Sequence, residues 1–533
     1  MSILMLSSPN ARWWAMAATA MSLLVVGLDM TVLNVALPDI AVVLHATNSD
    51  LQWFADAYLL VLGALLLPAG MLGDRYGRKR LTLGALVVFG AGSLWCAYAG
   101  SPAALIAART LLGVGAAVLI PLAMSSVVVL FEPEERQKAI MVLGASTMIG
   151  LPLGPIVAGA LLQHFWWGSV FLINVPVVLL ALIAVWLFLP ESTSGEGSRR
   201  FDLAGIGLSS AGLLGFTFGM IEGPARGWSD GVVVGSLIIG IALLVAFFVW
   251  ERRVQGVEPV FDARLWSDRS FRWGSIGATV ASLAFFGLMF VVPQYLRAVL
   301  GADALGTGLR TLPMVAGLIA GMRGSMKLTD RFGGRIVGAA GFAVTAVGLF
   351  LGTTTRLGDG YLLTAIWTAI VGIGFGAALF SAQNAALQTL PKARAGAGSA
   401  LIQTLRQVGS VIGIAGLGAV LNGVYRSHVQ VAGLPATAAH AVRDNVASGV
   451  AAGQGIGSSA LVDSVRSAFV SGMSATLWIS CGVAILGAVL TLLFLPDGKD
   501  RTIDNGGGAQ APGPDVAQSI DASDTREAHP AAG

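Results

Sequence analysis

We single out four of the charged residues that lie inside long apolar stretches, where an ionic side chain is costly to bury. They are Asp29, Asp56, Arg109 and Arg406. A charge inside the hydrocarbon of a bilayer is rare and commonly marks a pathway for protons, ions or substrate. Burial disfavours a charged carboxylate, whereas a neighbouring arginine favours it. A carboxylate beside an arginine can therefore exchange a proton when their arrangement changes, and proton transfer is the first chemistry that these residues suggest.

The other reactive residue types form no pattern that an enzyme or a metal site requires. The two cysteines, Cys96 and Cys481, both lie in apolar runs, and the five histidines are scattered without ligand spacing. The glycine runs at Gly113 and Gly372 follow no strand, which excludes a nucleotide fold, and no phosphate-binding loop is present. We therefore expect no metal, no cofactor and no direct use of ATP. A membrane-embedded enzyme is a remote alternative.

The composition places these residues in a membrane protein. The chain has 533 residues, of which 55% are hydrophobic and 11% charged, against about 25% charged residues in soluble domains. This excludes a water-soluble protein and a nucleic-acid partner. Because a helix of about 20 apolar residues crosses a bilayer, we predict fourteen transmembrane helices. They run roughly over residues 13–36, 51–72, 81–99, 103–130, 139–162, 167–189, 203–222, 231–250, 273–299, 308–327, 335–353, 361–385, 396–421 and 469–495.

Basic residues gather in alternate loops and so predict the orientation. One set of loops contains Arg75 to Arg80, Arg136, Arg331 and Arg394, whereas the other set is nearly free of Lys and Arg. Cytoplasmic loops carry the excess of Lys and Arg. We therefore expect a multi-pass protein of the cytoplasmic (inner) membrane with both termini in the cytoplasm.

An internal repeat predicts the architecture. Asp74-Arg75-Tyr76-Gly77 follows the second stretch and Asp330-Arg331-Phe332-Gly333 follows the tenth, two helices later than two equal halves would place it. We interpret the seventh and eighth helices as a pair inserted between two six-helix bundles, an arrangement that fits a transporter with a central site. The expected domains are a cytoplasmic N-terminus (1–12), an N-terminal bundle (13–189), a linker with the inserted helices (190–272), a C-terminal bundle (273–495) with an extracellular loop (422–468), and a disordered cytoplasmic tail (496–533).

Three of the buried charges are expected at one depth. From the helical rise of 1.5 Å per residue, Asp29, Asp56 and Arg109 lie roughly 8 to 10 Å from the outer ends of their helices. We interpret Asp29 and Arg109 as the proton-coupling pair; the alternative is a static buried pair that fixes helix packing. Asp56 could instead lie at a wet helix end. Gln52 lies one turn before Asp56, on the same face.

Two glycine-rich segments are candidate conformational elements. The turn Gly73-Asp74-Arg75-Tyr76-Gly77-Arg78 lets Asp74 accept hydrogen bonds at the N-terminus of the next helix. It is either a latch between the bundles or a basic membrane anchor. The fifth stretch contains Gly150, Pro152, Gly154 and Pro155. Small residues four apart allow close helix approach and prolines bend a helix, which predicts a packing seam that seals a cavity or a tightly packed kinked helix.

Arg406 lies about ten residues into its stretch, which places it near the midplane, and shares a face with Gln403 and Gln407. It could pair with carbonyl groups at a helix end, bind an anionic group of a substrate, or stiffen the second bundle. Gln294 adds another polar group whose role its spacing does not define.

Several of these segments together resemble one family, over roughly residues 13–495. Leu28 to Pro38, Gly70 to Lys79, Arg109 with Gly113 and Gly115, and the Gly/Pro run of the fifth stretch resemble motifs of the major facilitator superfamily, in its fourteen-span drug:proton antiporters. The resemblance implies a role for Arg109 in proton coupling. It also implies export, because uptake members generally lack the fifth-helix signature.

The segments Gln52 to Tyr58 and Trp167 to Pro176 are similar to those of exporters of quaternary ammonium compounds and dyes. We therefore expect a proton-coupled exporter of lipophilic, monocationic drugs that acts as a monomer in the lipid bilayer. Further acids, which some dication exporters carry in late helices, are absent here from the last six stretches. A dedicated exporter of a self-made antibiotic or metabolite is the alternative. The expected substrate-binding residues are Asp56, Gln52, Tyr58, Gln294 and Arg406.

Overall fold

The computed structural model describes most of the chain. The described residues are 9–46, 48–193, 200–253, 257–258, 263–391, 394–431, 434–435, 439, 442–443 and 446–496. Of the predicted termini, the tail from 497 onward and the first eight residues lie outside this part.

The N-terminal bundle consists of long helices with short connections. Its elements are α1 (Pro9–Val43), α2 (Asn48–Tyr76), α3 (Arg78–Ala97), α4 (Pro102–Leu130), α5 (Pro133–Leu162), α6 (Ser169–Leu172) and α7 (Asn174–Phe188). The predicted span over 167–189 is confirmed as one membrane span, Ser169–Phe188, in which a turn at Ile173 separates α6 from α7. This turn places Asn174 at the start of α7, where its side chain faces the interior of the bundle.

The second bundle repeats this pattern. It comprises α11 (Arg269–Gln294), the π-helical turn η1 (Tyr295–Val299), α12 (Ala304–Phe332), α13 (Gly334–Thr353), α14 (Tyr361–Gln388), α15 (Ala395–His428), α17 (Val446–Ile456) and α18 (Ser459–Phe494). The turn between α12 and α13 repeats that between α2 and α3, since Gly333 (φ 85°) and Gly77 (φ 99°) both adopt a positive φ, which glycine tolerates best.

Two further helices lie between the bundles in the sequence, α8 (Leu203–Arg226) and α9 (Gly231–Arg253). They pack on each other, and α8 also packs on α2 and α15. The segments that flank them meet in a two-residue parallel ladder of β1 (Arg200–Phe201) with β2 (Val257–Glu258), followed by α10 (Ala263–Ser267). The helix pair therefore lies against the join between the bundles.

The helices have the length and composition of membrane spans. Thirteen helices in the described part of the chain are long and apolar enough to cross a bilayer. The remaining predicted span, 139–162, lies in α5, a helix of 30 residues in which several central side chains are not described. Large apolar side chains of α9, among them Ile238, Ile239 and Val245, are exposed on its surface. The chain is a multi-pass membrane protein, and its helices are consistent with fourteen spans.

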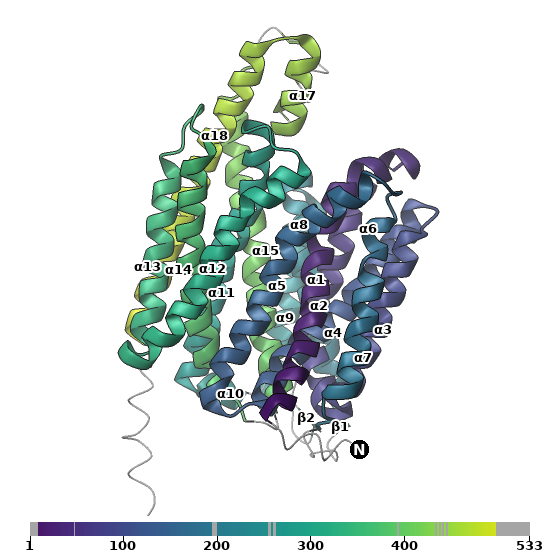
Figure 1. Cartoon of the computed structure of the whole chain (residues 1–533), viewed down its shortest axis with the longest axis vertical. Coiled ribbons are helices and arrows are strands. Elements are labelled where there is room, and N and C mark those ends of the chain that lie inside the picture. Colours follow the sequence, from purple (N-terminus) through teal and green to yellow (C-terminus); the bar gives the residue numbers. More distant parts are fainter. Residues whose placement is uncertain are drawn as a thin grey trace, which may run out of the picture.

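The bundles meet mainly where α5 packs on α12 and α2 on α15, with further contacts of α4 with α15 and of α5 with α14, and they lie side by side in Figure 1. We call the end that holds the α2–α3 turn, α10 and the chain's N-terminus the basic end, because the Arg/Lys-rich loops gather there. The other end is the far end.

One expected loop is largely helical. Residues 422–468 were expected to form a loop, but α15 continues to His428, α17 covers Val446–Ile456 and α18 begins at Ser459. These segments project beyond the bundles at the far end (Figure 1). The extension is anchored, because the Tyr425 hydroxyl donates to the Val442 carbonyl oxygen at 2.6 Å and Arg466 Nε donates to the Ala298 carbonyl oxygen at 3.0 Å. With 11 residues, α17 is too short to cross a bilayer, so a search for stretches of about 20 apolar residues does not find it.

Candidate transport site

Asp29 and Arg109 form a buried ion pair between α1 and α4. Arg109 Nη1 lies 2.6 Å from Asp29 Oδ2, and the two side chains are 2% and 0% exposed. The two residues are 80 positions apart in the sequence, and the packing of α1 on α4 brings them together. A buried pair is costly to separate, because removing one partner leaves an uncompensated charge.

Further hydrogen bonds fix the orientation of this pair. Arg109 Nε donates to the Phe54 carbonyl oxygen of α2 at 2.8 Å. The Asn174 amide donates to Asp29 Oδ1 at 3.2 Å and to the Ser93 hydroxyl at 3.0 Å. The sequence analysis gave no role to Asn174 or Ser93. The signal that could have found Asn174 is an amide two positions before Pro176, inside an otherwise apolar run. The network connects α1 to α2, α3, α4 and α7.

Tyr58 belongs to this network rather than to a cavity wall. The Arg109 guanidinium lies 4.6 Å from the centre of the Tyr58 ring. This is within the range of a cation–π contact. The Tyr58 side chain is 1% exposed, and its hydroxyl has no hydrogen-bond partner among the described residues. The aromatic face therefore adds to the stabilisation of the buried cation.

The other residues expected to bind substrate are dispersed. Asp56 is half-buried on α2, two positions after Phe54. Gln294 donates to the Phe290 carbonyl oxygen one turn back in its own helix. The side chain of Gln52 is outside the described part. Asp56, Tyr58 and Gln294 line neither of the two cavities described below, whereas Arg406 lines one of them.

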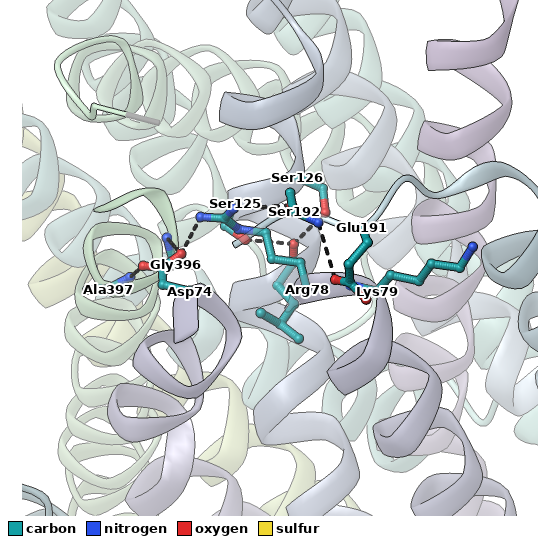
Figure 2. Close-up of polar contacts among 10 residues, drawn as sticks. Asp74, Arg78, Lys79, Ser125, Ser126, Glu191, Ser192, Gly396 and Ala397 are labelled. Carbon is teal, nitrogen blue, oxygen red and sulfur yellow. Dashed lines mark hydrogen bonds and ion pairs between the residues drawn. The ribbon is translucent and has the colours of Figure 1, made fainter. Parts of the chain in front are cut away.

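At the basic end, Asp74 connects the two bundles (Figure 2). Its two carboxylate oxygens accept hydrogen bonds of 2.9 Å each from the backbone N–H groups of Gly396 and Ala397. These groups are free because they lie in the first turn of α15, and the helix dipole favours a negative charge there. The prediction that Asp74 caps the next helix is therefore corrected: it caps α15 of the other bundle.

The residues around Asp74 hold it in place. Arg78 donates to Asp74 and, at 3.2 Å, to the Ser192 hydroxyl. Gly77 has φ 99°, and a side chain there would collide with Glu191. Gly73 packs on Leu122 of α4. Arg75, in contrast, is half-buried at the end of α2. The turn therefore presents a fixed, largely buried carboxylate to α15.

The second copy of the turn makes no equivalent contact. Asp330 is exposed, and no contact to the N-terminal bundle is seen for it in the described residues. The helix that would receive it, α5, begins with Pro133, which has no N–H, and has Glu134 and Glu135 in its first turn. These acids would repel Asp330. The latch is therefore one-sided although the sequence repeats.

Arg136 forms a second connection at the basic end. Its guanidinium donates to the carbonyl oxygens of Val128 and Phe131 at the end of α4 and of Leu387 at the end of α14, each at 3.2 Å. A cation at a helix C-terminus is favoured for the same reason that Asp74 is favoured at an N-terminus. The sequence analysis used Arg136 only for orientation. Together the two residues hold the bundles closed at this end.

The small residues of α5 pack on α1 of their own bundle. A side chain at Gly150 would meet the Leu24 carbonyl oxygen at 2.8 Å, and one at Gly154 would collide with the Thr31 hydroxyl. These two glycines therefore do not lie between the bundles, whereas Pro155 lines a cavity there. The side chain of Pro152 is outside the described part. The seam makes α1 and α5 one unit, with the Asp29 pair on one side and the cavity on the other.

Two adjoining cavities lie between the bundles. The larger has a volume of about 310 Å³ and is lined mainly by apolar and aromatic side chains. The smaller has a volume of about 100 Å³ and contains Arg406 in its wall. Met30, Phe286 and Leu318 line both. Since Met30 directly follows Asp29 on α1, the ion pair lies just behind the cavity wall.

Two helical bundles around shared cavities, with a latch at one end, define a membrane transporter. The chain belongs to the Major Facilitator Superfamily, whose family model matches residues 19–414. The fold is similar to that of the human organic anion transporter MFSD10, with a TM-score of 0.61 and 13% sequence identity over 91% of this chain and 100% of that one.

Curated relatives at higher identity are efflux proteins. The chain is 30% identical to the tetracenomycin C resistance and export protein of Streptomyces glaucescens, over 90% of this chain and 91% of the relative. It is 32% identical to the multidrug efflux pump LfrA of Mycolicibacterium smegmatis, over 91% of this chain and 95% of the relative. These likenesses identify the chain as a transporter of the drug-efflux group rather than an enzyme.

Proposed function

We propose that this protein exports lipophilic, monocationic drugs across the cytoplasmic membrane in exchange for protons. The observation that carries the proposal is the buried Asp29–Arg109 pair, 2.6 Å apart, directly behind the wall of an apolar cavity. When α1 moves, the pair separates and Asp29 becomes neutral by taking up a proton. When the pair re-forms, Asp29 loses this proton. In this scheme the proton gradient is the energy source, and no cofactor takes part.

The direction of transport follows from the proposed orientation. With the basic end in the cytoplasm, as the positive-inside rule indicates, both termini are cytoplasmic and the latch of Asp74 and Arg136 closes the cytoplasmic side. Protonation of Asp29 from outside would then accompany drug release, and its deprotonation inside would reset the transporter. Each proton that crosses 100 mV contributes about 2.3 kcal/mol, so one or two protons are sufficient for a useful drug gradient. The unit is a monomer in this scheme, because one chain contains both bundles.

The test is transport by purified protein in proteoliposomes with an imposed pH gradient. We expect ethidium to move against its gradient, and an uncoupler to abolish this movement. Transport that persists without a gradient and requires ATP would refute the proposal.

A matched pair of variants tests the role of the carboxylate. Asp29→Asn keeps the size of the buried group and removes its proton site, so the pH-driven exchange should be lost while the protein remains folded. Asp330→Asn removes an exposed acid and should leave exchange unchanged. If Asp29→Asn transports at the wild-type rate, the pair is a static packing element.

A second candidate function is export of one self-made antibiotic or metabolite, which the likeness to the tetracenomycin C resistance and export protein favours. A drug-susceptibility panel with and without the gene distinguishes the two. Resistance to many unrelated lipophilic compounds supports multidrug export, whereas protection against one compound class supports the dedicated exporter.

A further inference from the structure

The two cavities differ in chemistry although they adjoin. The larger is lined by Phe285, Phe286, Met289, Phe290 and Met314, which offer apolar and polarisable surface. The smaller is lined on one side by Gln383, Gln403, Arg406 and Gln407. A ligand that spans both therefore meets an apolar wall at one end and polar side chains at the other.

Arg406 is a cation without an ionic partner. Its Nη1 donates to Gln403 Oε1 at 2.7 Å and its Nε donates to the Ser282 hydroxyl at 3.2 Å. No carboxylate forms an ion pair with it in the described part of the chain. A guanidinium carries five N–H donors, so these two bonds leave donors free toward the cavity. Charges at membrane depth are costly unless a partner compensates them.

The neighbouring glutamines add to this supply of donors. The side-chain amides of Gln383 and Gln407 line the same cavity and have no hydrogen bond within the described residues. Both amides carry two N–H donors. Each amide also carries one oxygen acceptor, but none of the described residues that line this cavity is acidic, so no negative charge of the protein competes for the Arg406 guanidinium.

The larger cavity, like the smaller one, has a positively charged residue in its wall. Among the described residues that line it, Arg297 is the one charged side chain, and none is acidic. Arg297 is exposed, whereas Arg406, on α15, is half-buried and donates to Ser282 of α11. The cavity lining therefore contains two cations and no anion.

We propose that Arg406, with Gln383 and Gln407, is a subsite for an oxygen acceptor of the transported compound, such as a quinone, ketone, phenolate or carboxylate oxygen. The apolar body of the compound then occupies the larger cavity. This inference rests on the proposed efflux function and names a chemical feature of its substrates. It is compatible with one positive charge elsewhere on the compound, outside the reach of the two arginines.

The test compares two lipophilic monocations that differ in this feature. Daunorubicin carries a hydroxyquinone and ketone oxygens, whereas ethidium carries no oxygen. Binding of both to the purified full-length protein is measured through the fluorescence of the compounds themselves, without any transport. Arg406→Met should weaken daunorubicin binding by about tenfold or more, the range expected for loss of a charge-assisted hydrogen bond. Ethidium binding should stay within about twofold, because ethidium offers no acceptor oxygen to this subsite.

Two control variants separate recognition from folding. Arg406→Lys keeps a charged donor and should recover part of the daunorubicin affinity. Arg297→Met removes the exposed arginine and should have the smaller effect. The inference is overturned if Arg406→Met weakens both compounds equally, as a structural role requires, if it changes neither, or if the wild-type protein binds ethidium as well as daunorubicin. Since the readout is binding, failure of proton-driven transport in proteoliposomes would refute the proposed function separately.

Discussion

The latch at Asp74 supports a quantitative prediction about the equilibrium between closed and open states. Asp74→Ala removes two hydrogen bonds of 2.9 Å to the first turn of α15 from a carboxylate that is only 4% exposed. Hydrogen bonds to charged groups contribute about 1.5–3 kcal/mol each, and loss of an N-cap costs about 0.5–2 kcal/mol. In the open state, water solvates the freed N–H groups. The free energy that favours the closed state should therefore fall by about 2.8 kcal/mol in Asp74→Ala. This corresponds to a shift of about a hundredfold.

Such a shift is large enough to see directly. If the basic end is open in about 1% of wild-type molecules, it should be open in about half of the Asp74→Ala molecules. Spin labels at Lys138 of α5 and Arg331 of α12, both exposed at the basic end on opposite bundles, report this as a second, longer distance. The measurement is made on the full chain in lipid nanodiscs.

Two variants make this prediction refutable. Asp74→Asn retains one acceptor oxygen and lacks the charge, so it should give an intermediate open fraction. Asp330→Ala removes the exposed acid of the repeated turn and should leave the distances unchanged. An unchanged distance distribution in Asp74→Ala would show that Arg136 and apolar packing hold the end closed without Asp74.

Three further changes test other parts of the molecule. Arg109→Ala leaves the Asp29 carboxylate buried and unpaired, which should destabilise the protein by about 3–5 kcal/mol; a thermal midpoint equal to that of wild type would contradict the buried pair. Asp56→Asn should weaken resistance to ethidium more than to neutral compounds in a susceptibility panel, and equal losses would assign Asp56 to coupling or folding. Gly154→Ala places a methyl group against α1 and should cost about 1–3 kcal/mol by overpacking. Gly207→Ala, inside α8 and with no neighbouring atom within 4 Å, should keep or slightly raise the melting temperature.

The fold class could be derived from the sequence because the bilayer imposes a simple rule. The predicted apolar stretches are helical over nearly all of their length, although 167–189 covers both α6 and α7 and 273–299 covers α11 and η1. Backbone groups in hydrocarbon must be satisfied within the helix itself. The rule does not apply outside the membrane. The helices within 422–468 were missed because their stability comes from local contacts such as that of Tyr425 with Val442 rather than from a run of apolar residues.

The proximity of Asp29 and Arg109 was also within reach of the sequence, because helical rise gives the depth of a residue. Depth alone does not give the direction in which a side chain points, however. Asp56 lies at a similar predicted depth, yet it lines neither cavity, and Tyr58 faces Arg109 rather than a substrate. The directions of the Asp56 and Tyr58 side chains depend on the rotation of α2 about its axis. Packing of α2 against α4 and α15 sets that rotation.

The sequence by itself determined the helices, the repeat and the rare buried charges, since these depend on composition, spacing and the cost of burying charge. Only the tertiary structure decided their partners. Asp74 caps a helix more than 300 positions away, Asn174 reaches Asp29, and Arg136 binds the end of α14. Most of these partners are backbone N–H and carbonyl groups, which nearly every residue carries, so the residue type does not reveal them. Which of them become partners depends on which helices the packed bundles bring together.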